Sequence, residues 1–108
     1  MIAASKWDKP GLARHIESVW CNPDELILRQ AVADWVGPNA GRLLDVGCGT
    51  ARMAPLLKGC RYIGVDGSKE MLRIARTRVP ARSLKLCDFM IERLPFPDQS
   101  FGSAICMQ

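Results

Sequence analysis

Apolar residues in the first third of the chain recur every three or four positions, which is the spacing of an amphipathic helix. The pattern predicts one helix over residues 11–20, where the apolar positions are Leu12, Ile16, Val19 and Trp20. Asn22 as the N-cap and Pro23 in the first turn predict the start of a second helix, which ends at Gly37-Pro38. The buried face of that second helix is predicted to consist of Leu26, Ile27, Ala31, Val32 and Trp35.

From about residue 42 the pattern changes to short apolar runs that end in glycine-rich or acidic turns. These runs predict four strands, at Leu43–Val46, Arg61–Val65, Ser83–Cys87 and Phe101–Met107. A helix is predicted over residues 51–58, although Pro55 fits it only in the first turn. Another helix follows Ser68 as its N-cap and closes at Pro80, with an apolar stripe of Met71, Leu72 and Ala75.

The alternation of strands and helices predicts an α/β fold with a doubly wound, mostly parallel sheet. We expect a helical N-terminal segment over residues 1–38 and a Rossmann-like core over residues 39–108. With 108 residues, 48% of them apolar and 24% charged, the composition is that of one globular domain and excludes collagen-like and disordered chains.

Charge and cysteine content bear on the binding partners and the cellular compartment of the protein. The net charge of +4 comes from scattered Lys and Arg residues, which gives little support for a nucleic-acid partner without excluding one. Five cysteines without C-x-x-C spacing argue against a disulfide framework or a zinc site and favour a reducing, cytoplasmic compartment. No apolar run approaches the roughly 20 residues that span a bilayer, so we expect no membrane association.

Candidate chemistry lies at the ends of the predicted strands. Asp45 precedes Gly47 and Gly49 at the end of the first strand, Asp66 ends the second and Asp88 the third. In an open α/β sheet, ligands bind beyond the carboxyl ends of the strands, and an acidic residue after the second strand is placed to accept hydrogen bonds from ribose hydroxyls. Asp88 is placed to accept from an adenine amine, with Phe89 beside the ring. The pattern therefore predicts a site for an adenine nucleoside.

A dinucleotide fits this pattern less well than a mononucleoside does. The G-x-G-x-x-G fingerprint needs a third glycine, and this chain has Arg52 at that position. A nicotinamide-dependent oxidoreductase is therefore disfavoured, but it stays open as an alternative.

Several segments together resemble class I S-adenosylmethionine-dependent methyltransferases, most closely the small-molecule, ubiquinone-biosynthesis-like subgroup. The resemblance covers about residues 40–108 and rests on Leu43–Thr50 with the small Ala51, Tyr62–Ser68, Met71-Leu72, Cys87-Asp88 and Leu94–Phe101. It implies that the chain binds S-adenosylmethionine and transfers its methyl group to a small-molecule acceptor. A methyltransferase-like interaction module without turnover is a further alternative.

The resemblance also implies roles for individual residues. Asp45 and Gly47 would hold the methionine ammonium group, and Gly49 would leave room for the cofactor. Asp66 would bind the ribose hydroxyls, while Ser68 and Met71 would border the ribose and adenine. The remaining implied positions are Asp88 and the backbone N–H of Phe89 at the adenine, Cys106 near the methionine end, Cys48 filling the glycine turn and Gly67 in the turn after Asp66.

Other residues have simpler interpretations. His15 is expected on the surface, the cysteines other than Cys48 are expected in the core, and neither a catalytic residue nor a metal ligand is identified. Gly102 departs from the family pattern, which usually has Asp after the Phe, and makes the anchoring of the fourth strand uncertain.

The family has a seven-stranded sheet, whereas this chain ends with the fourth predicted strand. We therefore expect a fold truncated after the fourth strand. An uncovered fourth strand would be an exposed apolar edge. This predicts either that the chain is part of a longer protein or that a second copy covers the edge as a homo-oligomer.

Overall fold

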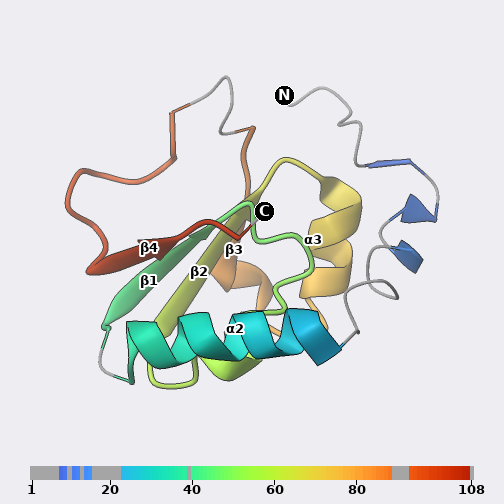
Figure 1. The fold of residues 1–108 in the computed structure, drawn as a ribbon. Helices are drawn as coiled ribbons and strands as arrows, with labels where there is room; N and C mark the ends of the chain where they lie inside the picture. The colour runs from blue at the N-terminus through green and yellow to red at the C-terminus, as the bar shows by residue number, and fades with distance from the viewer. Residues whose placement is uncertain are drawn as a thin grey trace.

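The computed structural model of the chain describes residues 8–9, 11–12, 14–15, 23–38, 40–88 and 93–107. Within them it forms the helices α2 (Pro23–Val36) and α3 (Lys69–Ala75) and two short 3-10 helices, η2 (Ala54–Leu56) and η3 (Ala81–Ser83). The strands are β1 (Arg42–Val46), β2 (Arg61–Asp66), β3 (Leu84–Leu86) and β4 (Ser103–Ile105). Figure 1 shows the strands side by side, with α2 and α3 at their flanks.

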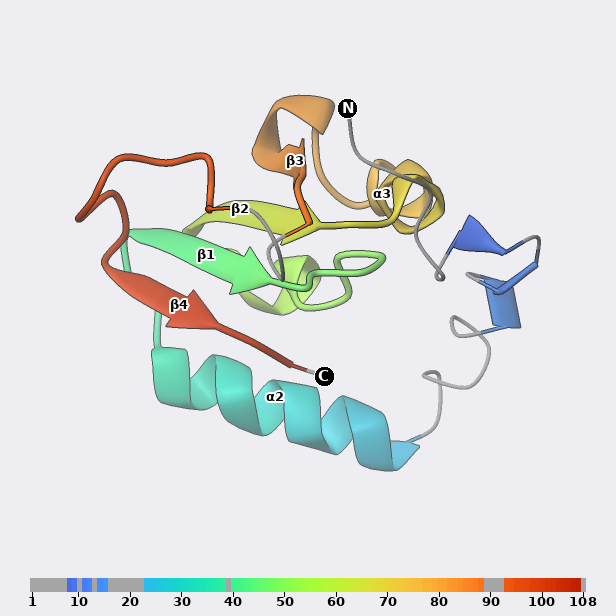
Figure 2. The ribbon, with the colours of Figure 1, turned by 90° about the horizontal axis from the view of Figure 1, so that it is seen from above.

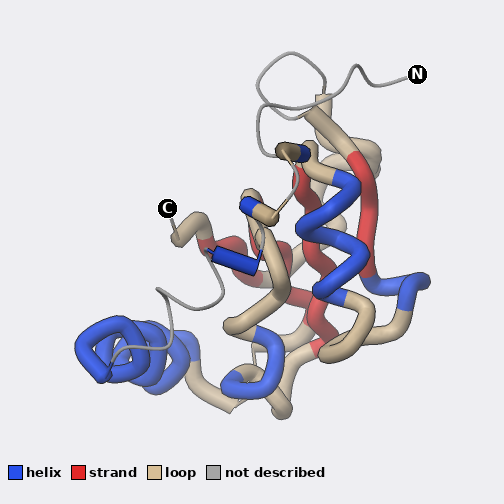
Figure 3. Tube along the Cα trace, turned by 90° about the vertical axis from the view of Figure 1, so that its right-hand side faces the viewer, coloured by secondary structure: helices blue, strands red, loops and turns tan. Residues whose placement is uncertain are grey.

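The four strands form one parallel sheet in the order β3-β2-β1-β4. Leu43 in β1 pairs with Tyr62 in β2 on one side and with Ser103 in β4 on the other. The chain thus adds strands outward from β1 in both directions, which creates the switch point at which α/β sheets bind ligands. Residues of α2 and α3 join the strands in one hydrophobic cluster, with α2 beside β4 and α3 nearer β2 and β3 (Figures 2 and 3). The parallel sheet that extends both ways from β1 confirms the predicted doubly wound α/β fold.

The core lies where the inner strands meet the segments that follow them. It contains Leu43, Tyr62, Leu72 and Ile105, with Ala51 and Leu57 from the segment between β1 and β2. None of the described cysteines forms a disulfide; Cys48 and Cys87 are buried, Cys60 is half-buried and Cys106 is exposed. The expectation that every cysteine other than Cys48 lies in the core is therefore wrong for Cys106, because β4 ends at Ile105 and leaves the next residue at the surface.

The helix predicted over residues 51–58 is wrong. Ala51 has a positive φ of 61°, which ends any right-handed helix at that residue. Pro55 cannot donate a backbone hydrogen bond, and only the three-residue helix η2 forms around it. The glycine turn after β1 therefore runs on through Ala51 before the chain turns back toward β2.

The helix predicted after Ser68 is confirmed but is shorter than expected. The Ser68 hydroxyl oxygen accepts from the Met71 N–H at 3.2 Å, as an N-cap does. The helix ends at Ala75, and residues 76–79 form turns before Pro80. The Thr77 hydroxyl donates to the Ile74 carbonyl at 2.7 Å, which satisfies one carbonyl of the last helical turn.

The strands β3 and β4 are also shorter than predicted. Contacts at Phe101 and Gly102, just before β4, show how this strand is anchored. The Gly102 N–H donates to the Arg42 carbonyl at 2.9 Å. A Cβ at Gly102 would lie 2.8 Å from the Ala40 carbonyl oxygen, so the glycine lets the backbone approach β1 closely. Phe101 stacks edge-on against Phe96 and lies under the Arg42 guanidinium, each at 4.9 Å. Backbone contact and ring packing thus hold β4 in place.

The bounds of α2 agree with the predicted helix, but of its predicted buried face only Val32 packs against the core. Among the described residues of α2, Arg29 and Ala33 are buried, and Val32 and Val36 pack partly against the core. The outer face of α2, defined here as Leu26, Ile27, Leu28 and Trp35, is exposed. Only a narrow stripe of the helix reaches the core, because α2 passes along the β4 side of the sheet (Figure 2).

The helix predicted over residues 11–20 lies mostly outside the described residues. The His15 N–H donates to the Gly11 carbonyl at 3.0 Å, which is a helical bond, and His15 is exposed as expected. Among the described residues, no helix is both long enough and apolar enough to cross a membrane.

Candidate functional site

The segments that follow β1, β2 and β3 meet at one end of the sheet. We call residues 45–51, 66–68 and 87–88 the carboxyl edge. Its first segment is a tight turn in which Gly47, Gly49 and Ala51 have positive φ values of 71°, 56° and 61°. The N–H groups of Gly47 and Cys48 both donate to the Val65 carbonyl at 2.9 Å. The turn is thereby fixed against the end of β2.

Asp66 joins two of these segments. One of its carboxylate oxygens, Oδ2, accepts from the Gly49 N–H at 2.9 Å, and the other, Oδ1, accepts from the Ser68 N–H at 2.9 Å. Burial raises the pKa of Asp66, and the hydrogen bonds from Gly49 and Ser68 oppose that rise. The carboxylate therefore holds the glycine turn and the start of α3 at a fixed separation.

Asp45 lies beneath the same turn and is only 2% exposed. The Tyr62 hydroxyl donates to Asp45 Oδ2 at 2.6 Å. Burial raises the pKa of Asp45 to about 6, the Tyr62 hydrogen bond opposes this, and the negative charge of Asp66 adds to it. Burial also raises the pKa of the Cys48 thiol and of the Tyr62 hydroxyl, so both stay protonated.

Gly64 makes the contact between Tyr62 and Asp45 sterically feasible. It pairs directly with Asp45 across the two strands. A Cβ at Gly64 would lie 2.8 Å from Cys48 Sγ and 3.2 Å from Cε1 of the Tyr62 ring. The missing side chain thus leaves the space that the thiol and the ring occupy beside Asp45.

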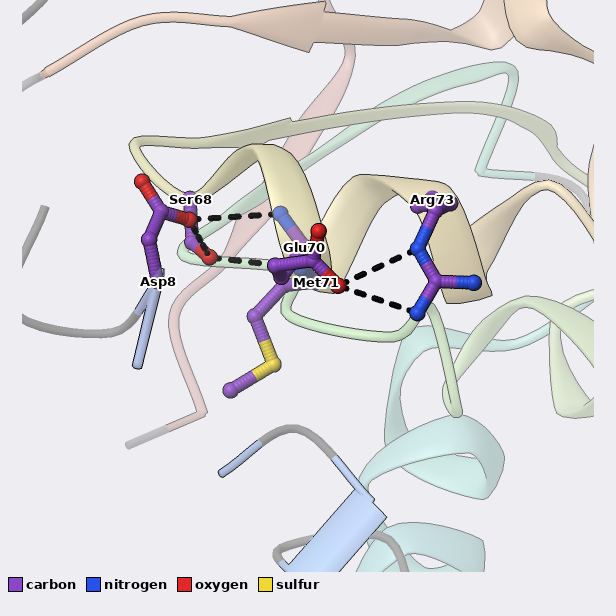
Figure 4. A network of polar contacts seen from close by, with 5 residues as sticks. All are labelled: Asp8, Ser68, Glu70, Met71 and Arg73. Atoms are coloured by element: carbon purple, nitrogen blue, oxygen red, sulfur yellow. Dashed lines mark hydrogen bonds and ion pairs between the residues drawn. The ribbon is translucent and has the colours of Figure 1, made fainter. Parts of the chain in front are cut away.

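A contact from the N-terminal segment was missed by sequence reasoning. Asp8 Oδ1 accepts from the Ser68 hydroxyl at 2.7 Å and from the Glu70 N–H at 3.2 Å. Figure 4 shows Asp8 at the start of α3, beside the ion pair in which Arg73 Nε and Nη2 both donate to Glu70 Oε2. Nothing in the local sequence links residues 60 positions apart. Among the causes that shift the pKa of Asp66, the charge of Asp8 raises it.

The other predicted site residues divide into those at the carboxyl edge and those that lie elsewhere. Asp88 is half-buried, and its Cα lies 3.7 Å from a Cβ built at Gly67, so the ends of β2 and β3 touch. Met71 is buried in α3. Cys106 follows Ile105, the residue that pairs with Asp45. Phe89 lies outside the described residues.

A small polar pocket of about 150 Å³ lies beside α3, with Lys9, Gly11, Arg14, Glu70 and Arg73 as its described lining residues. None of these is a strand-end residue. Across the described part of the chain, no group of three or more His, Cys, Asp or Glu side chains is placed to hold a metal ion.

Comparison with known proteins relates this arrangement to one enzyme family. A family model described as a methyltransferase domain matches residues 44–108, which contain the end of β1, all of β2 to β4 and the whole carboxyl edge. The chain belongs to this methyltransferase family. The expected class I S-adenosylmethionine-dependent family is thereby confirmed, and the matched region agrees with the segment that carries the sequence resemblance.

Individual methyltransferases give the same result. The chain is 35% identical over 86 residues to a phosphatidylethanolamine N-methyltransferase of Cereibacter sphaeroides, covering 73% of this chain and 41% of the relative. It is 37% identical over 68 residues to a demethylmenaquinone methyltransferase of Chlorobaculum parvum, covering 60% and 27%. It is 31% identical over 83 residues to a trans-aconitate 2-methyltransferase of Variovorax paradoxus, covering 73% and 30%. The chain thus spans less than half the length of these methyltransferases.

Proposed function

We propose that this chain binds S-adenosylmethionine at the carboxyl edge and forms the cofactor-binding part of a methyltransferase with a small-molecule acceptor. The observation that carries the proposal is the pair of carboxylates, Asp45 and Asp66, at the glycine turn. Burial raises the pKa of each carboxyl group, and the charge of Asp66 raises the pKa of Asp45 further. A ligand that brings positive charge would relieve both effects.

S-adenosylmethionine fits this electrostatic environment, whereas a dinucleotide does not. The cofactor carries an ammonium and a sulfonium group, and its ribose offers two hydroxyl donors. A pyrophosphate placed on the same glycine turn would lie against the buried Asp45 carboxylate and be repelled by it. This repulsion, together with Arg52 in place of the third glycine, favours the methyltransferase over the nicotinamide oxidoreductase.

Each of these residues would contact a different part of the cofactor. Asp45 and the Gly47 carbonyl face the ammonium group, while Gly49 and Cys48 line the turn without large side chains. Asp66 accepts from the ribose hydroxyls, with Gly67, Ser68 and Met71 around it. Asp88 and the Phe89 N–H bind the adenine, and Cys106 borders the methionine end.

When bound, the cofactor supplies a methyl group that is already activated by the positive charge on sulfur. The protein then has to align the acceptor and exclude water. The relatives are named for phosphatidylethanolamine, demethylmenaquinone and trans-aconitate, which differ chemically, so their names support methyl transfer but do not select an acceptor. A cytoplasmic location and a second copy over the edge of β4 stay predictions.

Calorimetric titration tests the proposal. We expect S-adenosylmethionine and S-adenosylhomocysteine to bind the chain and NADH not to bind. Asp66→Ala should weaken binding by about 1–3 kcal/mol, because it removes a charged acceptor of two hydrogen bonds. Asp34→Ala, which changes an exposed carboxylate on α2, is the matched control and should bind like the wild type. Binding of NADH but not of S-adenosylmethionine would overturn the proposal.

A further inference from the structure

Tyr62 is the only residue of β2 whose side chain is shown to hydrogen-bond the Asp45 carboxylate. It stands early in the strand, opposite Leu43, and its ring extends two residues along the same face to reach Asp45. Neither the family resemblance nor the strand-end pattern assigns it a role in binding. Gly64 between the two residues leaves room for this reach.

The hydrogen bond fixes one oxygen of the carboxylate. Oδ2 is held by the Tyr62 hydroxyl at 2.6 Å, a short distance typical of an O–H donor to a charged oxygen. Holding Oδ2 sets the plane of the carboxylate and therefore the direction in which Oδ1 is presented. Because the Tyr62 hydroxyl stays protonated, it acts as a permanent donor.

We infer that Tyr62 is a positioning residue for cofactor recognition: its hydroxyl orients Asp45 and keeps it ionised, so that the carboxylate binds the ammonium group of the methionine moiety. This inference rests on the proposed function. It assigns to a residue in the body of β2 a role that the strand-end motifs leave out.

The charge state of Asp45 depends on few neighbours. Tyr62 and Asp66 reach it from β2, and Cys48 from the glycine turn. On the β4 side it pairs with Ile105, which is apolar. Of these groups, Tyr62 favours the ionised carboxylate, while burial and the charge of Asp66 oppose it. Removing the hydroxyl should therefore move the titration of Asp45 upward into the neutral range.

Tyr62→Phe tests the inference, since it keeps the ring and removes only the hydroxyl. The first measurement is the carboxyl titration of Asp45 by NMR without ligand, which should shift to higher pH in the variant. The second is calorimetry with two probes over pH 5.5–8.5. S-adenosylhomocysteine carries the ammonium group, whereas 5′-methylthioadenosine lacks the amino-acid moiety.

We expect Tyr62→Phe to weaken S-adenosylhomocysteine binding roughly tenfold or more near pH 6.5 and to do so less at pH 8.5, where Asp45 ionises again. Binding of 5′-methylthioadenosine should stay within about twofold of the wild type. Trp35→Phe, an aromatic change on the outer face of α2, should leave both titrations unchanged.

The outcomes separate the inference from the function on which it rests. Equal loss of both probes at every pH would show that Tyr62 is only structural and would overturn the inference. So would an unchanged Asp45 titration or unchanged S-adenosylhomocysteine binding in Tyr62→Phe. Absence of binding by the wild type would instead overturn the proposed function, and the inference with it.

Discussion

The carboxyl edge buries polar side chains, whereas the outer face of α2 exposes apolar ones. At the carboxyl edge, Ser68 is fully buried and Asp45 is 2% exposed, whereas on α2 Ile27 is 68% and Trp35 84% exposed. Hydrogen bonds from Tyr62 and to Asp8 stabilise the buried polar groups. The comparison shows that burial in this chain follows the position of a residue relative to the sheet more than its polarity.

The two regions also differ in what burial costs. A buried carboxylate lowers the stability of the fold at any pH at which it is ionised, while an exposed tryptophan changes the stability little. If the carboxyl edge is built for a ligand, replacing its groups should change both stability and binding. Replacing residues on the outer face of α2 should change neither.

Asp45→Asn should give the largest effect. The pKa of Asp45 rises from 3.8 to about 6. Between these two pH values the folded state holds a proton that the unfolded state has lost. This contribution to stability is complete below pH 3.8 and is lost as pH rises through 6. At pH 8 the neutral Asn should therefore stabilise the folded chain by up to about 3 kcal/mol, measured by urea unfolding.

Below pH 4 the same substitution should have almost no effect on unfolding, because both side chains are then uncharged. S-adenosylhomocysteine binding should fall at least tenfold at pH 8, in contrast to the gain in stability. An Asp45→Asn variant that unfolds more easily at pH 8 would show that the buried carboxylate contributes net stability. This would contradict the expectation that its burial lowers stability.

Gly64→Ala should destabilise the chain by about 2 kcal/mol, since the new Cβ would overlap Cys48 and the Tyr62 ring. Gly67→Ala is the matched control for stability, because its Cβ would meet its nearest neighbours at ordinary contact distances of 3.6 and 3.7 Å. Thermal unfolding of the two variants measures the difference. Equal melting temperatures would show that the packing around Asp45 yields easily.

Ser68→Ala should cost about 1 kcal/mol of unfolding free energy, because α3 loses its N-cap and Asp8 loses the hydroxyl donor. Ser68→Thr, which keeps a hydroxyl, should recover part of this loss. Protection of the Met71 amide in hydrogen exchange gives a local measurement. The contact with the N-terminal segment contributes little if Ser68→Ala leaves that protection unchanged.

Ile27→Gln and Trp35→Gln should each change stability by less than about 0.5 kcal/mol, because both side chains are exposed and Gln is a good helix former. Ala33→Leu on the same helix is the contrasting control and should cost about 1–3 kcal/mol, since Ala33 is buried. Urea unfolding measures all three. A loss above 1 kcal/mol at Trp35 would show that the outer face of α2 is covered in solution.

Sequence reasoning predicted the features that depend on local pattern. The strands β1 and β2, the bounds of α2 and the Ser68 cap follow from apolar runs and capping residues that lie within a few positions of one another. Asp45 and Asp66 were predicted at the carboxyl edge because parallel strands end together. These features needed no knowledge of strand register.

The features that were missed depend on contacts between distant segments. The bond from Tyr62 to Asp45 requires the register in which Leu43 pairs with Tyr62, and the bond from Ser68 to Asp8 spans 60 positions. The helix predicted over residues 51–58 failed because Ala51 takes a left-handed conformation that composition does not reveal. Most of the predicted buried face of α2 was wrong because helical spacing shows that a face is apolar but not what covers it.

The strand order has a consequence for how the chain folds. Leu43 pairs with Tyr62, 19 residues later, and with Ser103, 60 residues later. Closing the longer loop costs about 1 kcal/mol more in chain entropy, so β1, β2 and β3 should associate before β4 docks. During synthesis the glycine turn and Asp66 would then be in place while the β4 side of Asp45 is still hydrated. Docking of β4 would be the step that finally removes water from that carboxylate.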